Sequence, residues 1–399
     1  MQIINTHLKV GSNCLVKNRV YFFNITFNGV FYLDTQDFSI HFVHKFSFHP
    51  DYAVELSLNA SLAYNNDIYF FPNNTNVILK YSILKQREEF IPIQDCNDKF
   101  CISSAIRRQD MVYMFPKNLE RGIYVFDLKN QRVEKDKKLS SLFCSEFRCS
   151  KGHIFYDNKD CVMIGRYGGS QLLKINLVTK QIVFEKVMEG MQIYCMCFDG
   201  KHCWILTMDS TDIYEWDMEN DTLQRYINKD ISWRKKDCIG KQPYSNLVFL
   251  EDEILVLNCY AENIWRIDRD KKSIGNPIKY PKKFRMVNNQ FCYWPVYAQY
   301  TMLGDKVLLY PYAGNVLLVY DIKTKEVSGK DLLVSDQEIP YLKEVLIENF
   351  MEKGECLEND DFGKLESFTS MVKTNNRNGQ VRNHEKVGQT VWESLRKER

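Results

Sequence analysis

A pattern that recurs seven times along the 399-residue chain limits what it can fold into. In each copy an apolar stretch ends at an Asp, Asn or Ser, and a short polar turn follows. The end points are Leu33-Asp34, Tyr81-Ser82, Phe126-Asp127, Ile175-Asn176, Trp216-Asp217, Ile267-Asp268 and Tyr320-Asp321, spaced 41 to 53 residues apart. A repeat of this length fits four short strands with their connections, which is the unit of a β-propeller blade.

The order of residues within each copy supports this interpretation. A polar turn precedes a near-continuous apolar run such as Ile254 to Leu257, as expected for a strand that is buried on both faces. The next strand alternates apolar and other residues, and then reaches the Asp or Asn. Side chains of this kind bond their own backbone in tight turns, so we expect a structural role and not a catalytic one for these carboxylates.

Two copies, Ile175 to Val183 and Tyr320 to Val327, carry the order strand-Asp or Asn-x-x-Thr-x-x-Val most fully. In this the chain resembles the seven-bladed propellers of the YVTN and quinoprotein-like groups, over residues 10 to 335. The resemblance implies an architecture and no particular activity. The Gly-His and Trp-Asp pairing of WD repeats and the double glycines of kelch repeats are missing.

We therefore predict an all-β, seven-bladed β-propeller over residues 1–335, followed by a short α-helical C-terminal extension over residues 336–399. In the extension, Leu342, Val345, Leu346 and Phe350 recur at helical spacing, and a second helical pattern contains Trp392. Either both helices pack on the outside of the propeller, or they bind a partner protein through Phe350 and Trp392. The sequence leaves open which strand closes the ring and whether residues 3–10 or 14–16 form the first inner strand.

The composition of the chain indicates which kinds of partner and which cell compartment to expect. Lys and Arg (53) nearly balance Asp and Glu (51), so no general positive field favours nucleic acid as a partner. No apolar stretch approaches the roughly 20 residues of a membrane-spanning helix, and no secretory leader is visible. The thirteen cysteines have no regular spacing, which indicates reduced thiols and a cytoplasmic protein.

The expected binding surface is the mouth of the central channel. In a propeller, loops between the second and third strands and loops between blades crowd one face around the axis, and function usually lies there. The candidate ligand-binding residues on these loops are His49, Arg121, Arg166, Tyr167, Asp209, Tyr260, Trp294 and Tyr312. Residues of these types offer flat contact area and directional hydrogen bonds, which suits a protein, peptide or carbohydrate ligand.

The loop Gly165-Arg166-Tyr167-Gly168-Gly169 is the most distinctive of these. Arg166 could hold a carboxylate or phosphate with two hydrogen bonds, or the glycines could simply shape a tight turn. The loop lacks the lysine and the following helix of a phosphate-binding loop.

Cys195, Cys197 and Cys203, with His202 nearby, raise the possibility of a zinc site. Their spacing does not match zinc ligand pairs, and buried thiols are the expected alternative. We expect no metal and no cofactor.

The leading hypothesis is a non-catalytic binding or scaffolding module. The alternative is a lyase, an epimerase or a sugar-active enzyme with its site at the same mouth, where His49 or Asp51 could act as general base. A quinoprotein-like oxidoreductase is disfavoured, because it would need a secretory leader and a calcium-bound cofactor site.

Overall fold

The structure is a computed structural model of the whole chain. It describes residues 2–4, 10, 12–24, 27–46, 58–73, 75–94, 100–143, 147–149, 154–156, 160–208, 210–228, 243–259, 263–284, 296–312, 314–335, 337–342, 344–345 and 372–373. Of the residues predicted to bind ligands or partners, His49, Asp209, Tyr260, Trp294, Phe350 and Trp392 lie outside these ranges.

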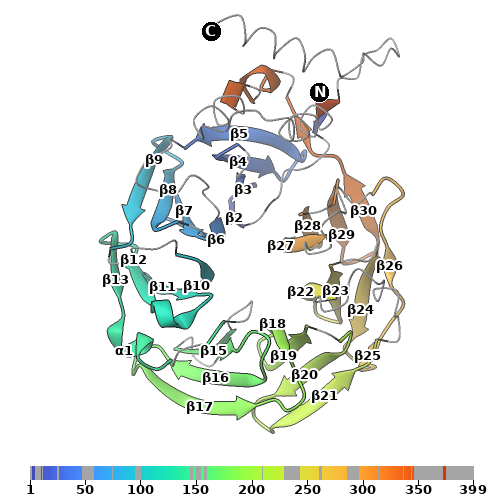
Figure 1. Cartoon of the computed structure of the whole chain (residues 1–399). Coiled ribbons are helices and arrows are strands. Elements are labelled where there is room, and N and C mark those ends of the chain that lie inside the picture. The colour runs from blue at the N-terminus through green and yellow to red at the C-terminus, as the bar shows by residue number, and fades with distance from the viewer. Residues whose placement is uncertain are drawn as a thin grey trace, which may run out of the picture.

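Seven antiparallel sheets stand radially around a central axis, so the predicted seven-bladed propeller is confirmed (Figure 1). In each blade the first strand lies nearest the axis and the fourth lies outside. Blade 1 consists of β2 (Asn13–Val16), β3 (Arg19–Asn24), β4 (Gly29–Asp34) and β5 (Ser39–Lys45). Blade 2 consists of β6 (Leu58–Tyr64), β7 (Asp67–Pro72), β8 (Val77–Ser82) and β9 (Arg87–Pro92). Blade 3 consists of β10 (Ile102–Arg108), β11 (Met111–Pro116), β12 (Tyr124–Asp127) and β13 (Arg132–Lys135).

The later blades repeat this order with more variation in the outer strand. Blade 4 consists of β14 (Ile154–Tyr156), β15 (Cys161–Gly165), β16 (Gln171–Asn176) and β17 (Gln181–Val187), and blade 5 of β18 (Ile193–Phe198), β19 (His202–Thr207), β20 (Ile213–Asp217) and β21 (Thr222–Tyr226). Blade 6 consists of β22 (Tyr244–Phe249), β23 (Glu253–Asn258), β24 (Asn263–Asp268) and two short outer strands, β25 (Ser273–Ile274) and β26 (Ile278–Lys279). Blade 7 consists of β27 (Tyr297–Leu303), β28 (Lys306–Pro311), β29 (Leu317–Asp321) and β30 (Val327–Lys330). The 3-10 helix η1 (Leu119–Arg121) and helix α1 (Lys137–Ser140) lie in connections of blade 3.

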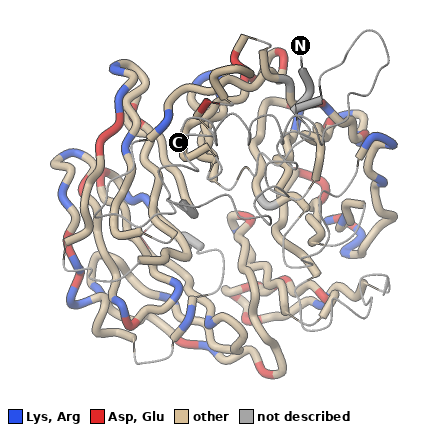
Figure 2. Tube along the Cα trace, turned by 45° about the horizontal axis from the view of Figure 1, so that its top comes forward, with Lys and Arg blue, Asp and Glu red and all other residues tan. Residues whose placement is uncertain are grey.

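The hydrophobic core is divided into layers between neighbouring blades. Second strands such as β15 and β23 are buried along their whole length, as predicted from the apolar runs. Their side chains alternate between the layers on either side. In blade 6, for example, Ile254 and Val256 join the cluster shared with blade 5, and Leu255 and Leu257 join the one shared with blade 7. Charged residues gather on the outer strands and turns (Figure 2).

The turn between the third and fourth strands has the same geometry in all seven blades. The fourth residue after each predicted end point has a positive φ, between 49° and 63° (Phe38, Gln86, Gln131, Lys180, Asp221, Lys272 and Lys325). In six blades an Asp or Asn side chain accepts hydrogen bonds from the turn N–H groups. Asp127, for example, accepts from the N–H of Lys129 and of Asn130, each at 2.9 Å. The predicted structural role of these residues is confirmed, and Ser82 of blade 2 is the exception among the seven.

Residues 14–16, one of the two segments considered for the first inner strand, lie in the inner strand of blade 1, and the C-terminal chain joins the same sheet at its outer edge. Blade 1 takes all four strands from residues 13–45, with β2 innermost, and blade 7 takes its own from residues 297–330. After blade 7, β31 (Leu333–Val334) pairs in parallel with the outer strand β5 of blade 1, with Leu333 opposite Ser39 and Val334 opposite Ile40. Strands β1 (Gln2–Ile4) and β32 (Val372–Lys373) extend this sheet further outward.

The chain after β31 adds to this closure. Residues 339–342 and 344–345 are helical, and the side chains of Leu342 and Val345 share a buried cluster with blades 1 and 7. On the same side of blade 1, His41 Nδ1 lies 3.5 Å from a carboxylate oxygen of Glu338. The apolar side predicted for this helix therefore packs on the propeller at these positions, and it covers the seam between the first and last blades.

Removing a side chain from this seam should weaken the whole ring. We expect Leu342→Ala to lower the free energy of unfolding by about 2 kcal/mol or more, because a buried leucine leaves a cavity. The measurement is urea unfolding followed by circular dichroism.

The neighbouring Glu344 provides the matched control, since it lies on the exposed side of the same helical segment. Glu344→Ala should change the unfolding free energy by less than about 0.5 kcal/mol. Equal effects of the two substitutions would show that this segment does not stabilise the closure.

Candidate functional site

The two faces of the ring carry different connections. The rim face carries the connections between the second and third strands, such as residues 117–123 and 166–170, and those between blades. The turn face carries the short turns, such as residues 109–110 and 128–131. All four described members of the predicted binding set, Arg121, Arg166, Tyr167 and Tyr312, belong to connections of the rim face.

Main-chain hydrogen bonds hold the rim face in a fixed form. In blades 3, 5, 6 and 7 the residue after the second strand donates its N–H to the carbonyl just before the first strand; these pairs are Lys117–Cys101, Met208–Gln192, Cys259–Pro243 and Tyr312–Val296, at 2.8 to 2.9 Å. In these blades the first strand also starts with a register shift, which is typical of a β-bulge. Side chains on these loops are therefore presented from a rigid base.

The loop 165–169 is the clearest case. The N–H of Tyr167 donates to the carbonyl of Arg148, and the N–H of Gly168 donates to the carbonyl of Ile193 at the start of blade 5, both at 2.8 Å. Gly168 has φ +67°, in the left-handed region that glycine adopts without strain. The glycines thus shape a tight turn, which leaves the side chains of Arg166 and Tyr167 exposed.

The same bridges bring further cations beside Arg166. Residues 147–149 lie between the rim loops of blades 3 and 4, with Arg148 paired to Asn118 and Cys149 paired to Arg166. Four exposed side chains thereby follow one another along this part of the rim, and we call them the cationic arc: Lys117, Arg121, Arg148 and Arg166. Glu120 is the exposed acid in the same loop of blade 3.

The repeat in the sequence also assigns Lys117 and Arg148 to loops of this face, but only Arg121 and Arg166 belong to the predicted ligand-binding set. Asn73 also belongs to this region, because its side-chain oxygen accepts hydrogen bonds from Lys117 Nζ at 3.2 Å and from Cys101 Sγ at 3.0 Å. Guanidinium and ammonium groups in such an arrangement can hold carboxylate, sulfate or phosphate groups.

Some other side chains of the rim face are less accessible to a ligand. Burial raises the pKa of Tyr312 to about 12, so its phenol stays protonated at neutral pH. Asp212 is mostly buried and accepts from Arg225 Nε at 2.9 Å, within its own blade. The described histidines are His41 and His44, on β5, and His202, at the start of β19, so none of them lies in a connection of the rim face.

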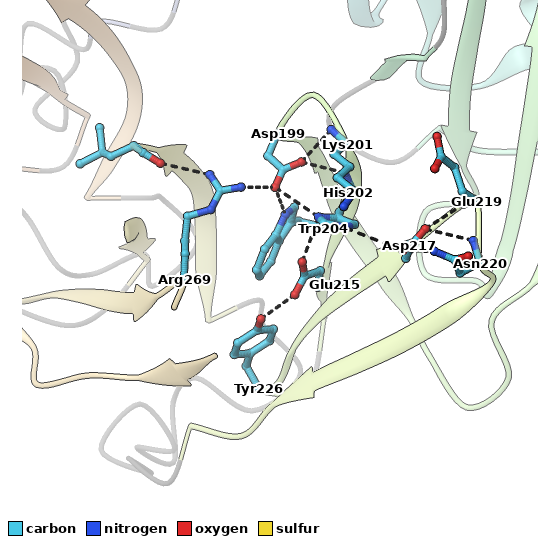
Figure 3. Close-up of polar contacts among 11 residues, drawn as sticks. Asp199, Lys201, His202, Trp204, Glu215, Asp217, Glu219, Asn220, Tyr226 and Arg269 are labelled. Atoms are coloured by element: carbon cyan, nitrogen blue, oxygen red, sulfur yellow. Dashed lines mark hydrogen bonds and ion pairs between the residues drawn. The ribbon is translucent and has the colours of Figure 1, made fainter. Parts of the chain in front are cut away.

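A second polar cluster, which the sequence did not predict, locks blade 5 to blade 6 (Figure 3). Asp199, in the turn before β19, is fully buried and accepts hydrogen bonds from Trp204 Nε1 at 3.0 Å and from Arg269 of blade 6 at 2.7 Å. The N–H groups of Lys201 and His202 donate to its other oxygen. Burial acts to raise the pKa of Asp199, but these donors and the Arg269 charge together lower it.

His202 lies beside this lock among three carboxylates. Its Nδ1 is 3.0 Å from Glu215 and 3.7 Å from Asp199, and its Nε2 is 4.0 Å from Asp217 (Figure 3). Glu215 also accepts from the hydroxyl of Tyr226 at 2.5 Å. Burial, together with this bond, raises the pKa of Tyr226. Asp199 and Glu215 accept hydrogen bonds from other side chains, whereas the buried Nδ1 of His202 makes none with the described residues. The contact of Asp199 with Arg269 gives the cluster the character of a structural lock between blades.

A similar pair of contacts joins blades 6 and 7. Lys325, in the outer turn of blade 7, lies 2.8 Å from Asp252 and 3.0 Å from Glu253 in blade 6. Tyr320 donates a hydrogen bond to Glu253. Ion pairs of the turn face are therefore used to hold blades together.

The thiols raised as zinc candidates are mostly buried. Cys195 and Cys203 belong to the two opposite layers of blade 5, and burial raises the pKa of Cys203. Hydrogen bonding to Cys195 and burial raise the pKa of Cys197, and these two thiols are therefore neighbours. Among the residues that the structure describes, no group of three or more His, Cys, Asp or Glu could hold a metal ion.

In the described ranges, no helix has the length and apolarity needed to cross a lipid bilayer.

The fold defines the chain as a seven-bladed β-propeller protein. No family model and no curated protein matches its sequence. Among solved structures it is similar to a streptogramin B lyase (14% identity, TM-score 0.57, covering 79% of this chain and 95% of the other). It is also similar to virginiamycin B lyase from Staphylococcus aureus (9% identity, TM-score 0.56, covering 84% of this chain and 98% of the other). A chain of the mitotic checkpoint complex is similar as well (8% identity, TM-score 0.53, covering 80% of this chain and 90% of the other). At these identities the likeness concerns the fold alone.

The outer-turn carboxylates predict how stability depends on pH. The side chain and N–H of Asn220 lower the pKa of Asp217 to about 2, and turn N–H groups lower those of Asp127, Asp268 and Asp321. An unfolded Asp has a pKa of about 3.9, so this stabilisation is complete above about pH 5 and is lost as the pH falls toward 2. We expect the thermal unfolding midpoint to fall over this interval.

The variant Asp217→Asn keeps an acceptor in the turn but removes the titrating group. Its unfolding midpoint should fall less steeply than that of the wild type between pH 5 and 2. A midpoint with the same slope in both proteins would contradict the assignment.

Proposed function

We propose that the chain is a non-catalytic binding module that holds an acidic protein, peptide or glycan ligand on the rim face. The observation that carries the proposal is the cationic arc of blades 3 and 4, presented on loops that main-chain hydrogen bonds fix in place. Arg166 supplies a planar group for a carboxylate or sulfate, and Tyr167, 38% exposed, supplies an aromatic surface beside it.

The chemistry of these groups favours binding over catalysis. Arginine stays charged at every pH at which proteins fold, so the guanidinium groups of the arc can attract and orient a ligand but cannot act as bases. The near-neutral total charge of the chain (+2) supplies no general attraction for an acidic ligand, so the attraction must come from local groups such as the arc. A fixed loop also lowers the entropy that a ligand must overcome to bind.

The proposal also includes the cell compartment of the protein and the role of its C-terminal extension. We place the protein in the cytoplasm, because its irregularly spaced cysteines suit a reducing compartment. Residues 1–335 form the propeller, and residues 336–399 form an extension that docks a partner protein through Phe350 and Trp392. Both of these residues lie outside the described ranges.

A propeller enzyme with its site at the same mouth is the second hypothesis. Streptogramin B lyase is an enzyme built on a similar fold, but the likeness does not reach the level at which activity can be compared. Both residues considered as general base, His49 and Asp51, lie outside the described residues.

Binding should depend on the arc. An array of acidic peptides and of neutral and sulfated glycans would be incubated with the wild-type chain and with Arg148→Gln/Arg166→Gln. We expect the double variant to bind the acidic ligands about 10-fold or more weakly, because two charge-assisted hydrogen-bonding groups are lost.

The matched control is Lys129→Gln/Lys201→Gln, which removes two exposed cations from the turn face. This variant should bind like the wild type. If both variants bound the acidic ligands equally more weakly, the effect would come from net charge alone, and the proposal would be wrong. Mass spectrometry of the bound ligands tests the second hypothesis, since a chemically altered ligand would favour an enzyme.

A further inference from the structure

The outer turn of blade 2 differs from its six counterparts in a single respect. It has the same backbone form, with Gln86 at φ 49°, but Ser82 replaces the Asp or Asn. In the other blades the side chain at this position accepts from one or both of the N–H groups two and three residues later, as Asn176 does from Val178 and Thr179 at 2.9 and 2.8 Å. In the described part of blade 2, no side chain accepts from the corresponding N–H groups of Leu84 and Lys85.

A hollow of about 240 Å³ lies where the missing acceptor would be. Ser82, which is 8% exposed, Lys85 and Arg87 all line it. Ser82 lies directly opposite Arg87 in the sheet, so the serine hydroxyl and the guanidinium are neighbours on one face of the blade. Lys85 and Arg87 have no acidic partner among the described residues.

The other charged groups of the hollow are already paired. Lys80 lies 3.4 Å from Asp67 and 3.1 Å from Glu89. This trio carries one excess negative charge, and Lys85 and Arg87 add two positive ones, so the hollow as a whole is cationic. Asp67 takes the place opposite Ser82 on the second strand, where its carboxylate faces Lys80.

We propose that this hollow binds a compact oxyanion, a carboxylate or a phosphate group, in the position that an Asp or Asn side chain fills in the other blades. One oxygen would accept from the turn N–H groups of Leu84 and Lys85, as the side-chain oxygens do elsewhere. Arg87 would hold a second oxygen, and the Ser82 hydroxyl would donate to the anion. The volume leaves room for the small group to which the anion is attached.

This site is separate from the one proposed on the rim face. It lies at the outer turn of blade 2, and none of its lining residues belongs to the cationic arc. Loss of binding at one site would therefore leave the other intact.

The test uses the full chain and inorganic phosphate, with sodium acetate as the carboxylate arm and sodium chloride at equal ionic strength as the reference. Calorimetric titration should show saturable binding of phosphate, of acetate or of both, and the ratio of the two affinities identifies the anion. Ser82→Asn copies the acceptor of blade 4 without adding charge, so it should fill the position and weaken binding about 10-fold or more.

Two further variants complete the test. Arg87→Gln should weaken binding by a similar factor without adding an acceptor, so a folding defect in Ser82→Asn would not hide the result. Lys129→Gln removes the exposed cation of the matching turn in blade 3, where Asp127 is present, and should bind like the wild type. No saturable binding of either anion in the millimolar range, or equal binding by wild type, Ser82→Asn and Arg87→Gln, would overturn the proposal.

Discussion

The hydrogen bonds between an Asp or Asn side chain and the N–H groups of the outer turn are the local interaction on which the repeat depends. They fix a turn with one left-handed residue, and that turn sets the register of the fourth strand against the third. The lowered pKa values of Asp127, Asp217, Asp268 and Asp321 are the electrostatic mark of the same bonds. A turn without such an acceptor, as in blade 2, keeps its backbone form, but its N–H groups remain available to another acceptor.

The layered core explains why the rim can serve as a binding surface. Each blade is stabilised by the apolar layers on its two sides, and the seam between blades 7 and 1 is covered by β31 and by Leu342 and Val345. Ion pairs of the turn face, such as Asp199 with Arg269, tie neighbouring blades together. The rim loops therefore start from fixed strand ends, and the exposed side chains on them can vary at little cost to the fold. Arg148 and Arg166 show the result, since main-chain bonds place them on adjacent loops while both side chains remain exposed.

The periodic part of the structure could be predicted from the sequence, because a repeated turn and an apolar second strand leave the same trace in every blade. Contacts that do not repeat from blade to blade could not be predicted in this way. Strand β31 has two residues, Leu333–Val334, too few for any alternation to show. The pairing of Arg269 with Asp199 depends on how neighbouring blades are oriented. The repeat assigns Arg121, Arg148 and Arg166 to loops of the rim face, but the bridges that join these loops, such as Cys149 with Arg166, could not be predicted from the sequence. Ser82 fits the repeat as an equivalent end point, and only its missing hydrogen bonds set it apart.

The central claim is that the repeated Asp is a structural acceptor and that blade 2 alone among the described turns lacks it. Urea unfolding of Asp127→Ala, Asp268→Ala, Asp321→Ala and Ser82→Ala tests this most directly. The account predicts that each Asp variant lowers the unfolding midpoint and that Ser82→Ala leaves it unchanged in anion-free buffer. A midpoint lowered by Ser82→Ala as much as by the Asp variants, or unaffected by all four, would contradict it.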